Sequence, residues 1–169
     1  EETLIVFTSD NGFNCGQHGI WGKGNGTFPM NMYDSSVKVP FIAVHQGHLP
    51  EGKVCGKMVS AYDFMPTLLE YVGIENPAAV NLPGHSFCGA LQDPAQQEDG
   101  SVVIFDEYGP VRMIRTRQRK YVRRYPYGPD EFYDLAADPD EKTNRIDDAD
   151  CAEEIRALRH QLDVWFCIY

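Results

Sequence analysis

Apolar residues occur in short runs that are separated by longer polar, glycine-rich segments. The first run, Leu4-Ile5-Val6-Phe7, ends at the polar cluster Thr8-Ser9-Asp10-Asn11-Gly12. Short β-prone runs that are bounded by Ser, Asp, Asn and Gly are typical of strands buried on both faces. We therefore predict a strand at residues 3–8 and a second buried strand from Val37 to His45, in which Pro40 indicates a beginning, an edge or a bulge.

Two other segments show helical periodicity. The first is expected to be a short core helix from Asp63 to Tyr71, with Asp63 as its N-cap and Gly73 as the residue that ends it. The second lies at the end of the chain, where Asp150 and Glu153 resemble a capping pair. Its apolar stripe should dock on a small sheet and consists of Ile155, Leu158, Leu162 and Trp165.

The second half of the chain has a different pattern. A stretch rich in Pro, Gly, Asn and Gln at residues 74–100 indicates a surface excursion that leads to a domain boundary. Beyond it we expect a strand at Val102 to Phe105 and an antiparallel pair formed by Val111 to Arg115 and Lys120 to Tyr125. The pattern therefore predicts one domain over residues 1–100 and a small α+β subdomain over residues 101–169.

Composition excludes some classes of function. The 169-residue chain has a formal net charge of -10, which argues against nucleic acid as a main partner, because phosphate binding needs a basic face. No apolar run reaches the roughly 20 residues that a membrane-spanning helix needs, so no membrane partner is expected. The five cysteines show no CxxC spacing. They favour free thiols, and hence a cytoplasmic location, with a periplasmic or secreted one as the alternative.

The polar cluster after the first apolar run is the strongest candidate for chemistry. In open α/β sheets, reactive groups gather just beyond the carboxyl ends of the strands. Asp10 offers a carboxylate and Asn11 an amide oxygen, which are the ligand types that calcium and magnesium prefer. The alternative is a simple turn, because Asn-Gly is a strong turn signal.

An ordered series of motifs extends over nearly the whole chain. They are Ser9-Asp10-Asn11-Gly12, Gly16-Gln17-His18-Gly19-Ile20-Trp21-Gly22-Lys23, Val37-Lys38-Val39-Pro40-Phe41-Ile42, Ala61-Tyr62-Asp63-Phe64-Met65-Pro66-Thr67-Leu68-Leu69, Leu82-Pro83-Gly84-His85-Ser86, Arg112-Met113-Ile114-Arg115-Thr116, Lys120-Tyr121-Val122 and Glu131-Phe132-Tyr133-Asp134-Leu135-Ala136-Ala137-Asp138-Pro139. The series resembles the carboxy-terminal part of the sulfatase family, within the alkaline-phosphatase superfamily. The resemblance implies an α/β fold: the second part of an alkaline-phosphatase-like mixed sheet with flanking helices, plus a small antiparallel sheet and a C-terminal helix.

The resemblance also implies roles for four residues. Asp10 and Asn11 would ligate Ca2+, with Mg2+ as the alternative ion. Lys23 would contact a sulfate oxygen and the bridging oxygen to the leaving group, although most lysines are solvated surface charges. His18 lies between these positions and is a candidate for substrate contact or proton transfer, although a lone histidine is more often a hydrogen-bonded structural residue.

The nucleophile of the family is expected outside this chain. It is a formylglycine made from the first residue of a Cys- or Ser-x-Pro-x-Arg motif, and none of the five cysteines begins that pattern. The chain is therefore interpreted as the C-terminal portion of a sulfatase, inactive by itself, with the remainder of the same enzyme and a sulfated small molecule or sugar as partners. A phosphodiesterase or phosphonate hydrolase of the same superfamily and a stand-alone acidic-glycan binding module remain as alternatives.

An arginine-rich segment follows residue 111. Arg115, Arg117 and Arg119 would share one face if the backbone stayed extended. We expect a solvated sheet face that balances the nearby acids Asp106, Glu107, Asp130 and Glu131. The alternative is a surface for an extended sulfated glycan.

Overall fold

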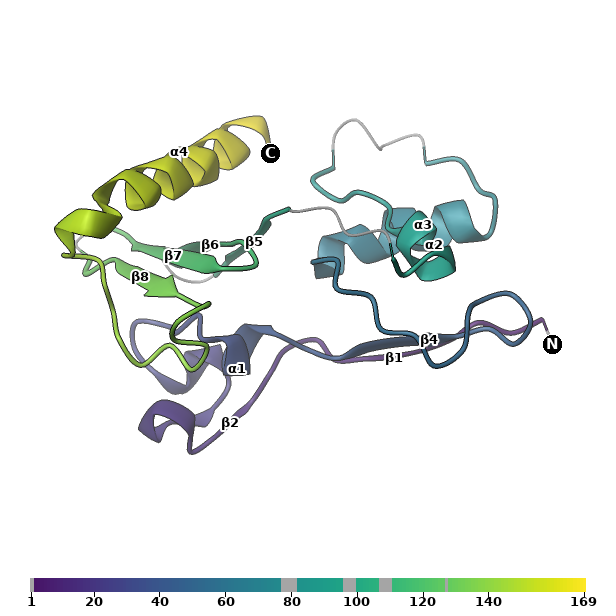
Figure 1. Ribbon diagram of the computed structural model, residues 1–169, viewed down its shortest axis with the longest axis horizontal. Coiled ribbons are helices and arrows are strands. Elements are labelled where there is room, and N and C mark those ends of the chain that lie inside the picture. The colour runs from purple at the N-terminus through teal and green to yellow at the C-terminus, as the bar shows by residue number, and fades with distance from the viewer. Residues whose placement is uncertain (1, 77–81, 96–99, 107–110, 127) are drawn as a thin grey trace. The chain divides into compact units, whose positions relative to one another are not determined.

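A computed structural model of the chain describes residues 2–76, 82–95, 100–106, 111–126 and 128–169 (Figure 1). The chain divides into two compact units. The first contains residues 1–10, 40–100 and 169, and the second contains residues 11–39 and 101–168. The glycine-rich segment 11–39 therefore belongs with the C-terminal residues, although two strands of the first unit flank it in the sequence.

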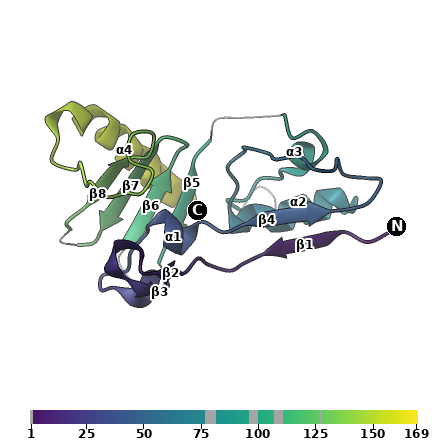
Figure 2. The ribbon, with the colours of Figure 1, turned by 60° about the horizontal axis from the view of Figure 1, so that its bottom comes forward.

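The first unit contains a two-stranded antiparallel sheet (Figure 2). Strand β1 (Ile5–Thr8) pairs with β4 (Phe41–Val44), so that Ile5 lies opposite Val44 and Phe7 opposite Ile42. Both predicted strands are confirmed, but the second is shorter than expected. Residues Asp34–Val37 form the helix α1 instead, and β4 begins directly after Pro40.

One face of this sheet is exposed. The two cross-strand pairs leave Ile5, Phe7, Ile42 and Val44 exposed by 61%, 62%, 54% and 51%. On the other face, the Phe41 ring contacts the rings of Phe64 and Phe87. The prediction that both strands are buried on both faces is therefore wrong for this chain, because only one face meets a packed layer. We call the side formed by Ile5, Phe7, Ile42 and Val44 the open sheet face.

A helical segment packs beside β4 in the same unit. The turn η3 (Ala61–Asp63) leads into α2 (Phe64–Tyr71), and Gly73, with φ 73°, lies just beyond its end as predicted. Asp63 is the N-cap residue of α2 as predicted, but its side chain makes no capping bond to that helix. Its carboxylate instead accepts hydrogen bonds from the backbone nitrogens of Ser60 and His85, at 2.7 and 2.9 Å.

Helix α2 is buried on a narrow side only, although a core helix was predicted. The buried residues are Pro66 and Thr67, whereas Phe64 and Leu68 are each 37% exposed. Thr67 is buried because its hydroxyl donates to the Asp63 carbonyl and accepts from the Phe87 nitrogen. A further helix, α3 (Cys88–Gln92), lies in the predicted surface excursion, parts of which (77–81 and 96–99) are outside the described residues.

The second unit is built on a four-stranded antiparallel sheet with the order β5-β6-β7-β8. Its strands are β5 (Val102–Phe105), β6 (Val111–Arg115), β7 (Arg119–Arg124) and β8 (Glu131–Asp134). The predicted strand and antiparallel pair are confirmed, whereas β8 was not predicted. The smaller elements are β2 (Asn14–Cys15), η1 (Gln17–Gly19), β3 (Trp21–Gly22), η2 (Gly24–Gly26) and η5 (Ala149–Cys151).

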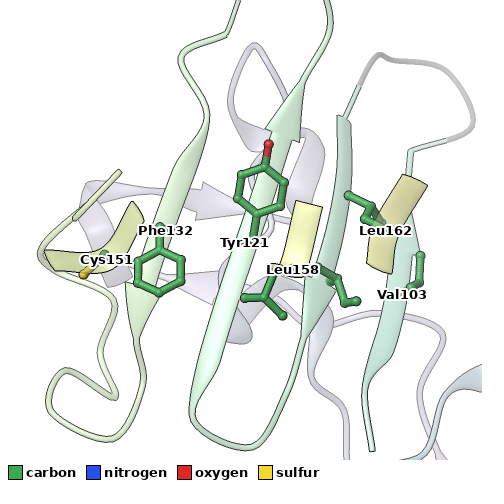
Figure 3. Close-up of a cluster of buried hydrophobic side chains, with 7 residues drawn as sticks. Val103, Tyr121, Phe132, Cys151, Leu158 and Leu162 are labelled. Carbon is green, nitrogen blue, oxygen red and sulfur yellow. The ribbon is translucent and has the colours of Figure 1, made fainter. Parts of the chain in front are cut away.

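Helix α4 (Ala152–Ile168) covers one face of this sheet (Figure 1). Leu158 and Leu162 pack against Val103, Tyr121 and Phe132, with Ile155 and Trp165 at the margin, so the predicted stripe is confirmed (Figure 3). The predicted capping pair of Asp150 and Glu153 is wrong. The turn η5 leads directly into the helix, and the N-cap residue of η5 is Asp148. Within the described ranges, no helix combines the length and apolarity that crossing a membrane requires.

The opposite face of the sheet is covered by the segment 11–39. Met32 is buried against Val111, Met113 and Val122, and Met30 and Val37 pack around this cluster. Strand alternation explains the division, since residues of one strand point in turn to the two faces. The four-stranded sheet is therefore enclosed between α4 and the segment that carries most of the candidate site residues.

Candidate functional site

Asp10 and Asn11 are consecutive residues that follow strand β1, as the sequence predicted, and they belong to different units. Asp10 is exposed, and the Ser9 hydroxyl donates to its Oδ1 at 3.3 Å. Asn11 is partly buried, and its Nδ2 donates to the Gly12 carbonyl at 2.8 Å. That bond uses the amide nitrogen rather than the oxygen that a metal ion would need.

Gly12 is fixed by close packing as well as by the turn. Its nitrogen donates to the Ser36 carbonyl at 2.9 Å, which draws the backbone against α1. A Cβ at this position would lie 2.2 Å from the Ser35 carbonyl oxygen, so no other residue fits without a backbone shift. The Asn11-Gly12 pair is therefore more than a generic turn, because the absence of a side chain allows the segment to pack.

His18 lies in the turn η1 with a left-handed backbone, φ 52° and ψ 22°. Few residues other than glycine adopt this conformation, and such strain is found most often at functional sites. The exposed imidazole stacks on the ring of Tyr33, with centroids 3.6 Å apart and an interplanar angle of 6°. The ring orientation of His18 is therefore set by an aromatic contact, which the sequence did not reveal.

Lys23 lies between β3 and η2 and is exposed. Its carbonyl accepts a hydrogen bond from the Gly26 nitrogen at 2.9 Å. The next carbonyl, that of Gly24, accepts from both the backbone nitrogen and Nδ2 of Asn31, at 3.0 and 3.1 Å. The backbone at Lys23 is thus held on both sides, while the ammonium group stays at the surface.

A buried charged network beneath the loop was not predicted. The ammonium of Lys120 is completely buried and donates to the Met32 carbonyl at 2.9 Å, to Asp34 Oδ1 at 2.6 Å and to Glu141 Oε1 at 2.5 Å. Arg115 forms a bidentate pair with Asp34, at 3.0 and 2.9 Å. Burial alone would raise the pKa of Asp34, but Lys120 and Arg115 outweigh that effect and hold it below 3.8.

One signal for this network was present in the sequence. Alternation along the predicted strand at Lys120 to Tyr125 places Lys120 on the same face as Val122, so a buried lysine could have been inferred. Its carboxylate partners could not have been inferred, since Asp34 and Glu141 lie 86 and 21 residues away.

The arginine-rich segment does not form the expected single face. The chain turns at residues 116–118, so Arg115 faces Asp34 whereas Arg119 pairs with Asp134 at 2.7 Å and with Glu154 at 2.5 Å. The hydrogen bond from Arg119 to Glu154 raises the pKa of that guanidinium.

Two of the acids expected to balance this segment do have partners. Glu131 pairs with Arg124 at 2.7 Å, and Asp130 accepts from the Tyr121 hydroxyl at 2.6 Å. Glu107 lies outside the described residues. The expectation that nearby acids balance these arginines is therefore confirmed at Glu131, but several of the arginines are held by specific carboxylates and do not form a solvated face.

The residues after β1 carry oxygen donors of the types that a metal ion takes. A carboxylate and an amide oxygen are hard donors of the kind that Ca2+ takes, so Asp10 and Asn11 fit that ion chemically. A calcium ion needs about six to eight oxygen ligands, so two side chains do not complete its coordination. Among the residues that the structure describes, no group of three or more His, Cys, Asp or Glu could hold a metal ion.

Known proteins resemble this chain over most of its length. Residues 16–165 match the family described as N-sulphoglucosamine sulphohydrolase, C-terminal. The chain is 34% identical over 158 residues to arylsulfatase K of Gallus gallus, a match that covers 85% of this chain and 28% of that protein.

Two solved structures share the fold. One is BT4656 in complex with its substrate D-glucosamine-2-N,6-O-disulfate, with a TM-score of 0.80 and 26% identity over 95% of this chain and 33% of that one. The other is the phosphonate monoester hydrolase of Agrobacterium radiobacter, with a TM-score of 0.79 and 27% identity over 98% of this chain and 35% of that one. The predicted α/β fold class is confirmed, and the chain spans about a third of the length of these proteins.

Proposed function

Because the chain belongs to the sulfatase family, matching the N-sulphoglucosamine sulphohydrolase C-terminal domain, we propose that it is the C-terminal portion of an enzyme that hydrolyses sulfate esters. The match of residues 16–165 carries this proposal. The proposed substrate class is a sulfated sugar or an aryl sulfate. It is supported by the disulfated glucosamine that BT4656 takes as its substrate and by the name of arylsulfatase K.

Asp10 and Asn11 are proposed as two of the ligands of a divalent cation, Ca2+ in preference to Mg2+. When bound, this cation would neutralise and orient the sulfate group. The remaining ligands and the formylglycine nucleophile are proposed to come from polypeptide beyond this chain, which covers only 28% of arylsulfatase K.

Lys23 is proposed as the cation that contacts the sulfate on the side of the leaving group. Its ammonium stands on a glycine-rich turn whose carbonyls are held by Gly26 and Asn31, so the positive charge is presented from a fixed backbone. As the sulfur–oxygen bond breaks, negative charge grows on the bridging oxygen. A positioned ammonium stabilises that charge, and this kind of stabilisation is a large contribution to catalysis.

His18 is proposed to contact the substrate or to transfer a proton to the leaving oxygen. The imidazole is exposed, and its stack on Tyr33 restricts the ring to one plane. An oriented imidazole is a suitable proton donor, because histidine is the side chain that most often serves as a general acid or base.

The test of this function uses the complete enzyme, a colorimetric aryl sulfate and the variants Asp10→Ala, Asn11→Ala and Lys23→Ala. We expect each variant to lose about 10²–10³-fold in kcat, the usual effect of removing one electrostatic contact to the transition state. The two oxygen-ligand variants should also lose bound metal, measured by mass spectrometry. Lys142→Ala is the matched control, because Lys142 is an exposed lysine that pairs with Asp140. If the Asp10 and Asn11 variants keep the wild-type kcat and the wild-type content of bound calcium, the proposal is wrong.

A second candidate is hydrolysis of phosphonate or phosphate esters. The similarity to the phosphonate monoester hydrolase, at 27% identity, favours it. An aryl phosphonate and an aryl sulfate with the same leaving group, offered to one preparation, would separate the two candidates by the ratio of kcat/KM.

A further inference from the structure

The segment 30–34, which ends at the first residue of α1, is bound to cations of the sheet. The Met30 carbonyl accepts from Arg124 Nη1 at 2.5 Å, and the Met32 carbonyl accepts from Lys120 Nζ at 2.9 Å. The Asp34 carboxylate accepts from Lys120 as well as from Arg115. Three cations of the sheet therefore hold three alternate residues of the segment.

The residues between them contact the loop that carries Lys23 and His18. Asn31 donates twice to the carbonyl of Gly24, the residue that follows Lys23. The Tyr33 ring stacks on the His18 imidazole. The segment is thus bound to three cations of the sheet, and through Asn31 and Tyr33 it also contacts Gly24, beside Lys23, and the imidazole of His18. The Tyr33 ring contacts that of Tyr133 on β8 as well, so the same residue links His18 to the sheet.

Lys120 is the centre of this connection. Its side chain is completely buried, and the facing side chain of Glu141 is only 2% exposed. The Glu141 carboxylate also accepts a hydrogen bond from the Asp34 backbone nitrogen at 2.6 Å. The two carboxylates that bind Lys120, those of Asp34 and Glu141, are therefore both held at Asp34. Residues 30–33 belong to no helix or strand, so their shape depends on these contacts. Fully satisfied buried polar networks give such segments a single, rigid geometry.

We infer that Lys120 is a positioning residue, which sets the location of Lys23 and His18 through the segment 30–34 without touching the substrate itself. The inference rests on the proposed function only in so far as Lys23 and His18 act on the substrate. The mechanical part, from Lys120 to the loop, stands on the hydrogen bonds and the ring stack alone. A small displacement of a catalytic group is enough to lower the rate strongly, because reacting groups must be held close to their productive geometry.

The test uses the complete enzyme carrying Lys120→Met together with Glu141→Gln. This pair removes one positive and one negative charge, so Asp34 and Arg115 remain as a balanced pair. We expect faster amide hydrogen exchange at Gly26 and Asn31, whose backbone nitrogens bond within the loop, and at least a tenfold loss in kcat/KM for an aryl sulfate.

The matched control is Arg119→Gln. Arg119 lies on the same strand as Lys120, but it pairs with Asp134 and Glu154 on the other face of the sheet. In the Arg119→Gln variant, the rate of amide hydrogen exchange at Gly26 and Asn31 should match that of the wild type, and so should kcat/KM. If the double variant does not fold, Asn31→Ala removes the side-chain hydrogen bond to the Gly24 carbonyl without disturbing a charge, while the backbone hydrogen bond remains, and the same two changes are expected.

Three results overturn the inference. The first is a double variant whose amide hydrogen exchange at Gly26 and Asn31 is unchanged. The second is a double variant whose exchange is faster but whose kcat/KM is unchanged. The third is an Arg119→Gln control that shows the same changes in exchange and kcat/KM as the double variant. An inactive wild-type enzyme would instead contradict the proposed function. In that case the exchange measurement still decides whether Lys120 holds the loop.

Discussion

The ammonium of Lys120 and the carboxylate of Asp34 lie 2.6 Å apart, although 86 residues separate them in the chain. This pair joins the glycine-rich segment to the sheet that forms much later in the sequence. A contact of such long range closes a large loop, so the conformation of the segment depends on prior or simultaneous formation of the sheet. The candidate site loop and the C-terminal sheet are therefore expected to gain and lose structure together.

Lys120→Met is expected to destabilise the chain by about 3–5 kcal/mol, because it leaves the carboxylate of Glu141 buried without its cation. Adding Glu141→Gln should recover part of this loss, since the double variant has no uncompensated charge at that position. The measurement is the free energy of unfolding in urea for the wild type, both single variants and the double variant. Additive effects of the two substitutions would show that the pair is not coupled.

The pKa of Asp34 predicts a loss of stability in acid. Because the folded-state pKa lies below the ordinary value of 3.8, the charged carboxylate stabilises the fold at higher pH. That contribution is fully present well above pH 3.8 and is lost as the pH falls below 3.8 toward the folded-state pKa. Acid titration of the wild type and of Asp34→Asn, followed by circular dichroism, measures this.

At neutral pH, Asp34→Asn should lower the free energy of unfolding by about 1–3 kcal/mol, since hydrogen bonds to charged groups have that value. Between pH 4 and pH 2 the difference between the two proteins should shrink. The exposed carboxylate Asp147 provides the control, and Asp147→Asn is expected to follow the wild-type curve. A constant difference over this range would contradict the assignment.

Gly12→Ala is expected to destabilise the loop through steric overlap. The new methyl group would lie 2.2 Å from the Ser35 carbonyl oxygen, which is backbone and cannot rotate away. A cost of about 1–3 kcal/mol is typical of such overpacking. Thermal unfolding should therefore show a clear decrease in Tm. Gly100→Ala is the control, because no atom of the described residues, its chain neighbours aside, lies within 4 Å of the added Cβ there, and its Tm should stay near that of the wild type.

Leu162→Ala tests the packing of α4 on the sheet. Leu162 is 1% exposed and contacts the cluster that contains Phe132 and Tyr121, so its truncation should cost about 2–5 kcal/mol. Val164 on the same helix is 41% exposed, and Val164→Ala should cost far less. Urea unfolding of both variants gives the comparison. Equal losses would mean that helix propensity, rather than burial, explains the effect.

The parts of the fold with a clear period could be predicted from the sequence. The apolar stripe of α4 repeats at helical spacing, and the pair β6 and β7 alternates around a polar turn. Strand β8 was missed because Glu131-Phe132-Tyr133-Asp134 is short and ends in charged residues. The exposure of β1 was missed because a continuous apolar run predicts a strand but does not reveal which layers cover it.

The candidate site was predictable only where residue type signals chemistry. A carboxylate and an amide after a strand indicate metal ligation, so Asp10 and Asn11 were predicted as ligands, and their role stays a prediction. The stack of His18 on Tyr33 depends on how an irregular segment folds back on itself. The same holds for the two hydrogen bonds from Asn31 to the Gly24 carbonyl. No periodic pattern encodes such contacts, so they could not be inferred.

The open sheet face also bears on how this polypeptide behaves in solution. The exposed apolar surface on this two-stranded sheet is formed by Ile5, Phe7, Ile42 and Val44. Among the described residues, each of the two strands pairs on one side only. Exposed apolar surfaces and unpaired strand edges of this kind promote association between molecules. The 169-residue chain handled in isolation is therefore expected to self-associate at micromolar concentrations, and a charged residue in place of Phe7 should keep it dispersed.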